Sequence, residues 1–450
     1  MCNWFFMITI ANYNKNVFNI FTRMLNFPFK TKLRSEIIRN SSIILGGNVL
    51  GQAIALLAYP ALTRIYSDSD FGIFAAFMSV STLLTTLGTG RYEESLVVAK
   101  DDKETVHLLG FTLKWLVFFS FLLLAGLFLF RKPIFSIFKM ESIESLWYFL
   151  PFTVLFTGLN YLLNNLATRE RQFKRIAASG LTQNGMNTAV KLIAGFAGLT
   201  RTGLIFSNVL SFLSGNFPYL FSLKKAVVEA LKGNWNSERK AALRYIDFPG
   251  FYMGRTFLSG FSINLPFLTL IGVFGEASLG LYSLAFTLLY RPVNLFGNSL
   301  YTTLFENAAS TLRDKKPILP SLKKYWKYSC IFILPCFVLV FFIARPLFTV
   351  LFGAQWKESA LYFQYLLPWM FVTLLASPVY FIPILFNKQK IALGLEITHF
   401  LFRWGALGIG IYLMHFQTGI LLFSLVGLLF TSLNFGWYYS MIYKYEQTLK

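Results

Sequence analysis

The sequence predicts an all-α polytopic membrane protein with about 12 transmembrane helices, and three observations carry this prediction. Hydrophobic residues make up 55% of the chain, and mean hydropathy is +0.56. Charged residues make up only 14%, whereas a soluble domain has about a quarter. The apolar residues fall into runs of about 20 residues, the length that a helix needs to cross a bilayer, and basic residues gather at alternate ends of these runs.

Twelve apolar runs are separated by polar connections, none of which is long enough to fold as a domain. We therefore expect the function to lie within the bilayer. The runs cover residues 42–63, 71–90, 108–130, 146–167, 177–199, 203–223, 246–273, 278–303, 325–344, 360–385, 391–413 and 419–440.

The basic residues indicate how the chain is oriented in the membrane. About 29 Lys and Arg residues lie on one side, in the N-terminal segment, alternate connections and the C-terminal tail, against about seven on the other side. Such an excess is typical of cytoplasmic loops, so we expect both termini in the cytoplasm. The same distribution explains the net charge of +21 without nucleic-acid binding, because the sequence has no basic face or nucleic-acid-binding module.

The most polar internal connection follows the sixth run and divides the chain into two sets of six. A weak internal repeat supports this division, because Pro60-Ala-Leu-Thr-Arg and Phe71-Gly-Ile resemble Pro266-Phe-Leu-Thr-Leu and Leu279-Gly-Leu. Both halves enter from the same side, so parallel repeats with a binding site between two lobes are expected. The expected parts are a cytoplasmic N-terminal segment (1–41), an N-terminal six-helix lobe (42–223), a cytoplasmic linker (224–245), a C-terminal six-helix lobe (246–443) and a cytoplasmic tail (444–450).

Five basic residues lie inside the runs, where a cation at the bilayer centre costs about 2.5–3.5 kcal/mol. Lys114 lies about two turns from an edge, so its stem is expected to snorkel to the headgroups. The other four outnumber the intramembrane carboxylates. We expect them to face the interior as a cationic lining for an anionic substrate, above all a phosphate, which guanidinium groups bind in a fork. They are Lys191, Arg255, Arg291 and Arg403.

Neutral polar residues share helical faces with two of these cations. Asn184 and Asn187 precede Lys191 at helical spacing, and Asn294 follows Arg291 by three residues. We expect the three asparagines to belong to the substrate-binding surface. The alternative for each is an interhelical hydrogen bond that holds the bundle together.

Three ionisable residues stack on one face of the eleventh run, namely Glu396, His399 and Arg403. A carboxylate beside a histidine inside the membrane suits a proton relay or an ion-coupling site, to which we assign Glu396 and His399. An equally suitable alternative is a self-neutralising stack that orients Arg403.

Sequence signatures of enzymes and cofactor sites are absent. HExxH, paired CxxC, Walker A, GxSxG and strand-linked GxGxxG motifs do not occur. The three histidines are too dispersed for a metal site, and three cysteines cannot build a framework of disulfides. We therefore expect a protein that is not an enzyme and has no cofactor and no metal. The apolar first ten residues lack the features of a signal peptide, and a start at either Met1 or Met24 stays open.

Several sequence pieces resemble those of a known family, and the resemblance covers almost the whole chain. The chain is similar to bacterial polysaccharide-biosynthesis membrane proteins of the oligosaccharide flippase (Wzx-type) family, which share a fold with multidrug exporters and lipid II flippases. The pieces are Pro-x-Leu-Thr-Arg-x-Tyr at 60–66, Asp-Phe-Gly at 70–72, Arg-Tyr-Glu at 91–93 and Leu-Phe-Gly-Ala-Gln-Trp-Lys-Glu-Ser-Ala at 351–360.

The resemblance implies two six-helix lobes around a central cavity. It also implies transport, by alternating access, of an undecaprenyl-pyrophosphate-linked oligosaccharide (an O-antigen, capsule or exopolysaccharide repeat unit) across the bacterial inner membrane. A polysaccharide polymerase and a chain-length regulator are implied partners. One alternative is a multidrug or small-molecule antiporter of the same fold, in which intramembrane acids would exceed cations. A second is a membrane-embedded polysaccharide polymerase or ligase, which would carry a large external loop.

Overall fold

The computed structural model describes residues 32–137, 139–313, 316–386 and 388–449, and every regular element in these ranges is helical. The long helices are α2 (Lys32–Ile65), α3 (Asp68–Thr89), α5 (Asp102–Ile137), α7 (Phe149–Arg169), α8 (Phe173–Phe196), α9 (Arg201–Leu231), α11 (Met253–Thr269), α12 (Ile271–Arg313), α14 (Leu334–Phe352), α15 (Ser359–Ala376), α17 (Gln389–Tyr412) and α18 (Phe416–Gln447).

Short helical segments lie between the long helices. They are α4 (Tyr92–Val98), α6 (Glu141–Glu144), α10 (Trp235–Arg244), α13 (Leu319–Tyr328), α16 (Ile382–Leu385), the π-helical turns η1 (Phe248–Tyr252) and η2 (Ser329–Ile333), and the 3₁₀ turns η3 (Ala354–Trp356) and η4 (Ser377–Val379).

The long helices overlap each of the twelve predicted apolar runs. In the described part of the chain, seven helical stretches are long and apolar enough to cross a membrane by length and composition. The prediction of an all-α polytopic membrane protein is therefore confirmed. The tenth run differs in detail, because its helix α15 ends at Ala376 and the remainder forms η4 and α16.

Local signals in the sequence fix the ends of α3. Ser67 caps its first turn, since its Oγ accepts a hydrogen bond from the Asp70 backbone N–H at 3.1 Å and the Asp70 carboxylate accepts one from the Ser67 backbone N–H at 3.1 Å. The helix ends at Gly90, which has φ 57°. Glycine adopts this left-handed conformation without steric cost.

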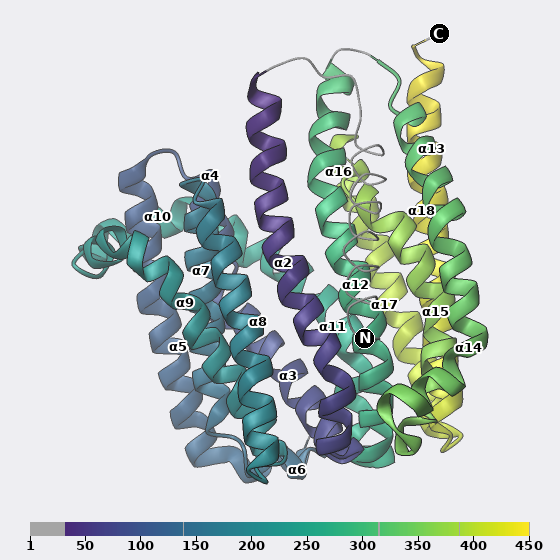
Figure 1. Ribbon diagram of the computed structural model, residues 1–450. Helices are drawn as coiled ribbons and strands as arrows, with labels where there is room; N and C mark the ends of the chain where they lie inside the picture. The colour runs from purple at the N-terminus through teal and green to yellow at the C-terminus, as the bar shows by residue number, and fades with distance from the viewer. Residues whose placement is uncertain (1–31, 138, 314–315, 387, 450) are drawn as a thin grey trace, which may run out of the picture.

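The helices form two groups that follow the halves of the sequence (Figure 1). In the first half, α8 packs against α2 and α9, and α7 packs against α9. In the second half, α12 and α18 pack against α15, and α17 packs against α18. The groups meet mainly where α3 packs against α11 and α12.

A reciprocal contact between two glycines joins α3 and α12. A Cβ added at Gly72 would overlap the carbonyl oxygen of Glu276, and a Cβ added at Gly280 would overlap the carbonyl oxygen of Asp68. The arrangement is symmetric, because Glu276 precedes Gly280 by four residues and Asp68 precedes Gly72 by four residues. The two glycines are equivalent positions in the internal repeat, so the contact has the two-fold symmetry expected of parallel repeats.

A second contact joins the halves at the same end of α3. The carbonyl oxygen of Thr63, near the end of α2, accepts hydrogen bonds from Gln355 Nε2 at 2.8 Å and from Trp356 Nε1 at 2.9 Å. The fully buried Trp356 ring also packs edge-on against Phe71, with 5.1 Å between ring centroids. A carbonyl in the last turn of a helix has no intrahelical partner, and the other half supplies one here. We call this contact and the glycine contact together the end seam.

The linker between the halves is docked on the first half. Lys114 Nζ on α5 lies 2.7 and 2.9 Å from the two carboxylate oxygens of Glu238 on α10, and it donates to the Gly233 carbonyl at 3.0 Å. Arg244 forms an ion pair with Glu104, whose carboxylate also accepts a hydrogen bond from the Tyr245 hydroxyl at 3.0 Å. The expectation that Lys114 snorkels to the headgroups is therefore wrong, because a buried carboxylate from the linker is its partner.

We expect Lys114→Met to destabilise the protein by about 3–5 kcal/mol, because it leaves the fully buried Glu238 carboxylate without a cation. The double variant Lys114→Met/Glu238→Gln should recover much of this loss. The thermal unfolding midpoint of each purified variant measures the loss of stability and its recovery. A loss in Lys114→Met no larger than that in Lys132→Met, an exposed lysine near the other end of α5, would contradict the prediction.

Candidate functional site

Two of the predicted cations come from opposite halves of the chain and lie near each other. Lys191 on α8 is 6% exposed, and its Nζ lies 4.5 Å from the centroid of the Phe74 ring on α3. Arg291 on α12 lies close enough for its charge to act on Lys191. Among the described residues, no carboxylate lies within ion-pair distance of either cation. Two like charges held in this way favour an anion between them.

The backbone around Lys191 is fixed by a contact with the end of α2. The hydroxyl of the buried Tyr66 donates a hydrogen bond to the Lys191 carbonyl at 2.7 Å. Tyr66 belongs to the sequence piece at 60–66, so the segment that contributes to the end seam also positions α8. The position of Lys191 is therefore coupled to the packing of α2.

The predicted asparagines have protein partners. Asn187 Nδ2 donates to Ser211 Oγ on α9 at 3.4 Å, and Asn184 Nδ2 donates to the Gly180 carbonyl of its own helix at 2.8 Å. Asn184 also packs closely against Gly51 on α2. Asn294 lies close to the side chain of Tyr290, one turn away on α12. These contacts agree with the alternative of hydrogen bonds that hold the helices together.

Arg255 is exposed, whereas Arg403 is enclosed within the second half. The Arg255 charge acts on Tyr301 and Tyr438. The Arg403 guanidinium lies 4.5 Å from the Trp369 ring and 5.0 Å from the Phe423 ring. Of the four predicted cations, Arg403 is buried among helices of the second half, whereas Arg291 lies near Lys191 of the first half.

The Arg403 guanidinium connects several helices of the second half. Its Nη1 donates to Ser262 Oγ on α11 at 3.1 Å, and the two rings that enclose it belong to α15 and α18. Cation–π contacts of this kind are worth about 2 kcal/mol or more where they are shielded from water. This arrangement suits a residue that holds helices together.

The predicted coupling residues are on the same helix as Arg403. Glu396 is half-buried, and its charge acts on Arg403, Tyr380 and Tyr438. His399 is buried and stacks on Phe430 at 4.9 Å, with 5° between the ring planes. The structure thus places Glu396 in a polar environment with Arg403, while the His399 ring packs against an aromatic neighbour.

An ionic cluster at the end of α3 was not predicted. Arg91 has φ 58°, and its guanidinium lies 3.4 Å from the Glu93 carboxylate and also forms an ion pair with Glu94. Glu94 lies close enough to Tyr252 of η1 for its charge to act on that side chain, so the cluster is next to the second half. Burial raises the pKa of Glu93, and the Arg91 charge opposes this shift. The Arg-Tyr-Glu piece at 91–93 marked this position, but its sequence did not indicate the contact with the second half.

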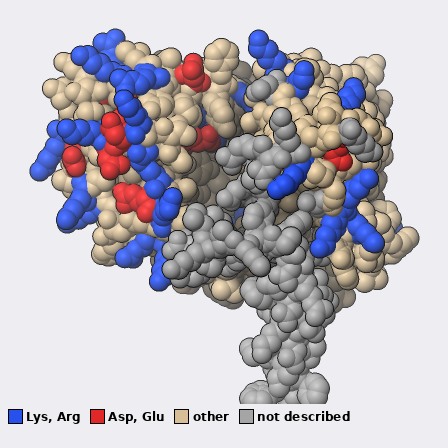
Figure 2. All heavy atoms as spheres, turned by 90° about the horizontal axis from the view of Figure 1, so that it is seen from above, with Lys and Arg blue, Asp and Glu red and all other residues tan. Residues whose placement is uncertain are grey.

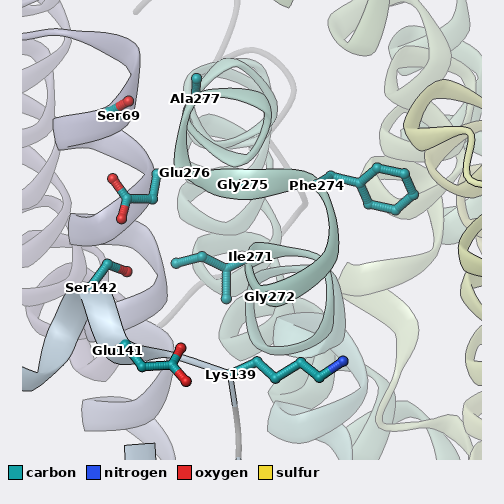
Figure 3. A pocket seen from close by; sticks show the side chains of 10 residues that line it. All are labelled: Ser69, Lys139, Glu141, Ser142, Ile271, Gly272, Phe274, Gly275, Glu276 and Ala277. Atoms are coloured by element: carbon teal, nitrogen blue, oxygen red, sulfur yellow. The ribbon is translucent and has the colours of Figure 1, made fainter. Parts of the chain in front are cut away.

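A surface cavity of about 700 Å³ lies next to the glycine contact and is lined by none of the nine predicted site residues. Figure 3 shows the Glu141 and Glu276 carboxylates on one side of the α12 backbone, while Phe274 points to the other side. The wall of the cavity includes Gly275, whose φ of 82° interrupts α12. The cavity borders the end seam, and neither Lys191 nor Arg291 lines it.

The opposite end of the molecule is hollowed between the two halves. Figure 2 shows this end, which carries the C-terminus, with a depression between two masses of side chains. Lys and Arg side chains gather around its rim on the first half. The halves are therefore in close contact at the end seam, whereas at the other end a depression lies between them and Glu94 of the Arg91 cluster approaches Tyr252.

Comparison with known proteins identifies the family. A model of the polysaccharide biosynthesis protein family matches residues 61–361, which is more than half of the chain. The chain belongs to the polysaccharide biosynthesis protein family. The predicted family is therefore confirmed.

A curated relative agrees with this family. The succinoglycan biosynthesis transport protein ExoT of Rhizobium meliloti (strain 1021) is 21% identical over 311 residues, which are 68% of this chain and 60% of that protein. The chain thus spans less than two thirds of the length of this relative.

Solved structures show that this family member has the fold of the MOP superfamily. The lipid II flippase MurJ in an inward closed conformation is 15% identical, with a TM-score of 0.68 over 92% of this chain and 91% of that chain. An inward-facing multidrug resistance MATE family transporter is 12% identical, with a TM-score of 0.67 over 88% and 96%. An outward-facing MATE transporter gives a lower TM-score of 0.56 over 91% and 96%.

Proposed function

We propose that this protein is a flippase that moves an undecaprenyl-pyrophosphate-linked oligosaccharide from the cytoplasmic to the outer leaflet of the bacterial inner membrane. The cargo would be an O-antigen, capsule or exopolysaccharide repeat unit. The observation that carries the proposal is the pair Lys191 and Arg291, two basic residues from opposite halves of the chain that have no carboxylate within ion-pair distance among the described residues. A pyrophosphate between them neutralises both, and its two phosphate groups can each contact one half.

The arrangement of the two halves supports movement by alternating access around a central cavity between two six-helix lobes. The halves are in contact at the end seam, and the surface between them is hollowed at the other end. The higher TM-scores with the two inward conformations agree with this arrangement. In the proposal, substrate enters at the hollowed end and leaves after the end seam separates.

The other predicted residues receive different roles in the proposal. Arg255, which is exposed near Tyr301, attracts the anionic substrate before it reaches Lys191 and Arg291. Arg403 acts indirectly by holding α11, α15 and α18 together.

The proposed orientation places the hollowed end in the cytoplasm. The excess of basic residues on one side supports it, because that side includes the linker and the C-terminal tail. Reporter fusions after Leu223 and Lys316 should read cytoplasmic, and a fusion after Lys139 should read external. The reverse pattern at Lys139 and Lys316 would contradict this orientation.

We further propose that Glu396 contributes to energy coupling. Glu396→Gln preserves the shape of the side chain and removes its charge, so it should weaken transport driven by a proton or sodium gradient while retaining binding of the lipid-linked substrate. Gradient-driven translocation in reconstituted vesicles, with binding measured in parallel, tests this. Glu358→Gln, an exposed position outside the long helices, is the control. Unchanged gradient dependence in Glu396→Gln would leave Glu396 as a structural partner of Arg403.

The proposed function is tested with purified protein in vesicles that contain an undecaprenyl-pyrophosphate-linked oligosaccharide in one leaflet. A lectin added outside should bind increasing amounts of the sugar when the protein is present. Undecaprenyl phosphate without sugar and a cationic drug serve as competing cargoes. Transport of the drug with no movement of the lipid-linked sugar would replace the proposal with the antiporter alternative.

A further inference from the structure

The linker at 224–245, together with the adjoining Ile246, has a buried acidic side and an exposed basic side. Glu238 is completely buried beneath α10 and is paired with Lys114, while Glu104 is 7% exposed and is paired with Arg244. The acidic groups around α10 are therefore neutralised inside the protein.

The basic residues of the linker remain on the surface. Among the described residues, none of them except Arg244 has a carboxylate within ion-pair distance, and Glu229 is the exposed acid of the stretch. Figure 2 shows Lys and Arg gathered over this half of the molecule. The exposed residues without such a partner are Lys224, Lys225, Lys232, Arg239 and Lys240.

Large apolar side chains are exposed beside these charges. Trp235 is 49% exposed, Leu243 is 54% exposed and Ile246 is 51% exposed. The face of α10 that carries Glu238 and two alanines packs against α5, and the half-exposed Trp235 ring stacks on Phe111 of that helix with 5.5 Å between ring centroids. An apolar face flanked by basic residues, at the end of the membrane-crossing helix α9, is typical of a helix in the interface of a bilayer.

We propose that α10 and the linker residues around it form a binding surface for the headgroups of anionic phospholipids. The basic side chains contact the phosphates, and Leu243 and Ile246 enter the layer between headgroups and acyl chains, next to the exposed part of the Trp235 ring that stacks on Phe111. The bound lipids hold the docked linker against the first half. This inference does not depend on which substrate the protein moves.

The experiment uses the full-length protein in neutral detergent and measures its thermal unfolding midpoint with added phosphatidylglycerol or phosphatidylcholine. Phosphatidylglycerol should raise the midpoint, and phosphatidylcholine should raise it much less. In Lys232→Gln/Arg239→Gln/Lys240→Gln the phosphatidylglycerol shift should fall to less than half. The matched control, Lys388→Gln/Lys390→Gln/Lys444→Gln, removes three exposed charges from the second half and should retain the full shift.

Native mass spectrometry of the unmodified protein gives a second measurement. The number of bound phosphatidylglycerol molecules should fall at high salt, because exposed ionic contacts are screened. Equal shifts in the two triple variants, or equal shifts with the two lipids, would overturn the proposal. Competition of soluble polyglutamate for the same surface with no effect of phosphatidylglycerol would identify an acidic polypeptide as the partner instead.

Discussion

Replacing either Lys191 or Arg291 by Gln should reduce transport of lipid-linked oligosaccharide by about 10- to 100-fold. Each substitution removes one charge-assisted contact to the pyrophosphate, and such contacts are worth about 1.5–3 kcal/mol, where 1.4 kcal/mol is tenfold. Arg291→Lys should recover transport only in part, because a point charge lacks the fork of the guanidinium group. Transport into vesicles at a fixed amount of folded protein is the measurement.

Two controls separate substrate binding from folding. Lys357→Gln removes an exposed cation beside the end seam and should transport normally. Arg255→Gln should lower transport less than Arg291→Gln, since Arg255 is exposed and lies outside the pair. Equal losses of transport and of folded protein in the Lys191 and Arg291 variants would show that the pair has a structural role.

Gly72→Ala and Gly280→Ala should each destabilise the end seam by about 1–3 kcal/mol, since the added Cβ overlaps a backbone carbonyl that cannot rotate away. The reciprocal geometry makes a sharper prediction for the double variant. The Cβ added by the first substitution moves α3 and α12 apart, and this leaves room for the Cβ added by the second substitution. The double variant should therefore cost clearly less than the sum of the two single variants.

The unfolding midpoints of the unmodified protein, the two single variants and the double variant together measure the coupling between the two glycines. Gly185→Ala on α8 is the matched control, because nothing lies within 4 Å of its added Cβ and alanine is the better helix former. It should be neutral or slightly stabilising. Strict additivity of the two seam variants would contradict the reciprocal contact.

The sequence indicated the helices and the seam better than it indicated the site. Apolar runs predict helices because burial in a bilayer requires them, and the repeat at Phe71 and Leu279 marked the two glycines that meet. The surroundings of Arg403 were not predictable, since a polar residue that faces a cavity and one that faces a neighbouring helix have the same spacing. The partner of Lys114 lies 124 positions away, a separation at which periodicity gives no information.

The docked linker also sets how far the two halves can move apart. Arg244 and Tyr245 are both held by Glu104, so the chain between the docked linker and α11 is the short stretch 246–252, which includes the π-helical turn η1. Fully extended, this stretch spans about 25 Å. A tether of this reach keeps each half at a local concentration of about millimolar around the other. Opening of the end seam is then a reversible rearrangement within one molecule. Undocking of α10 would lengthen the tether and lower the local concentration of each half around the other.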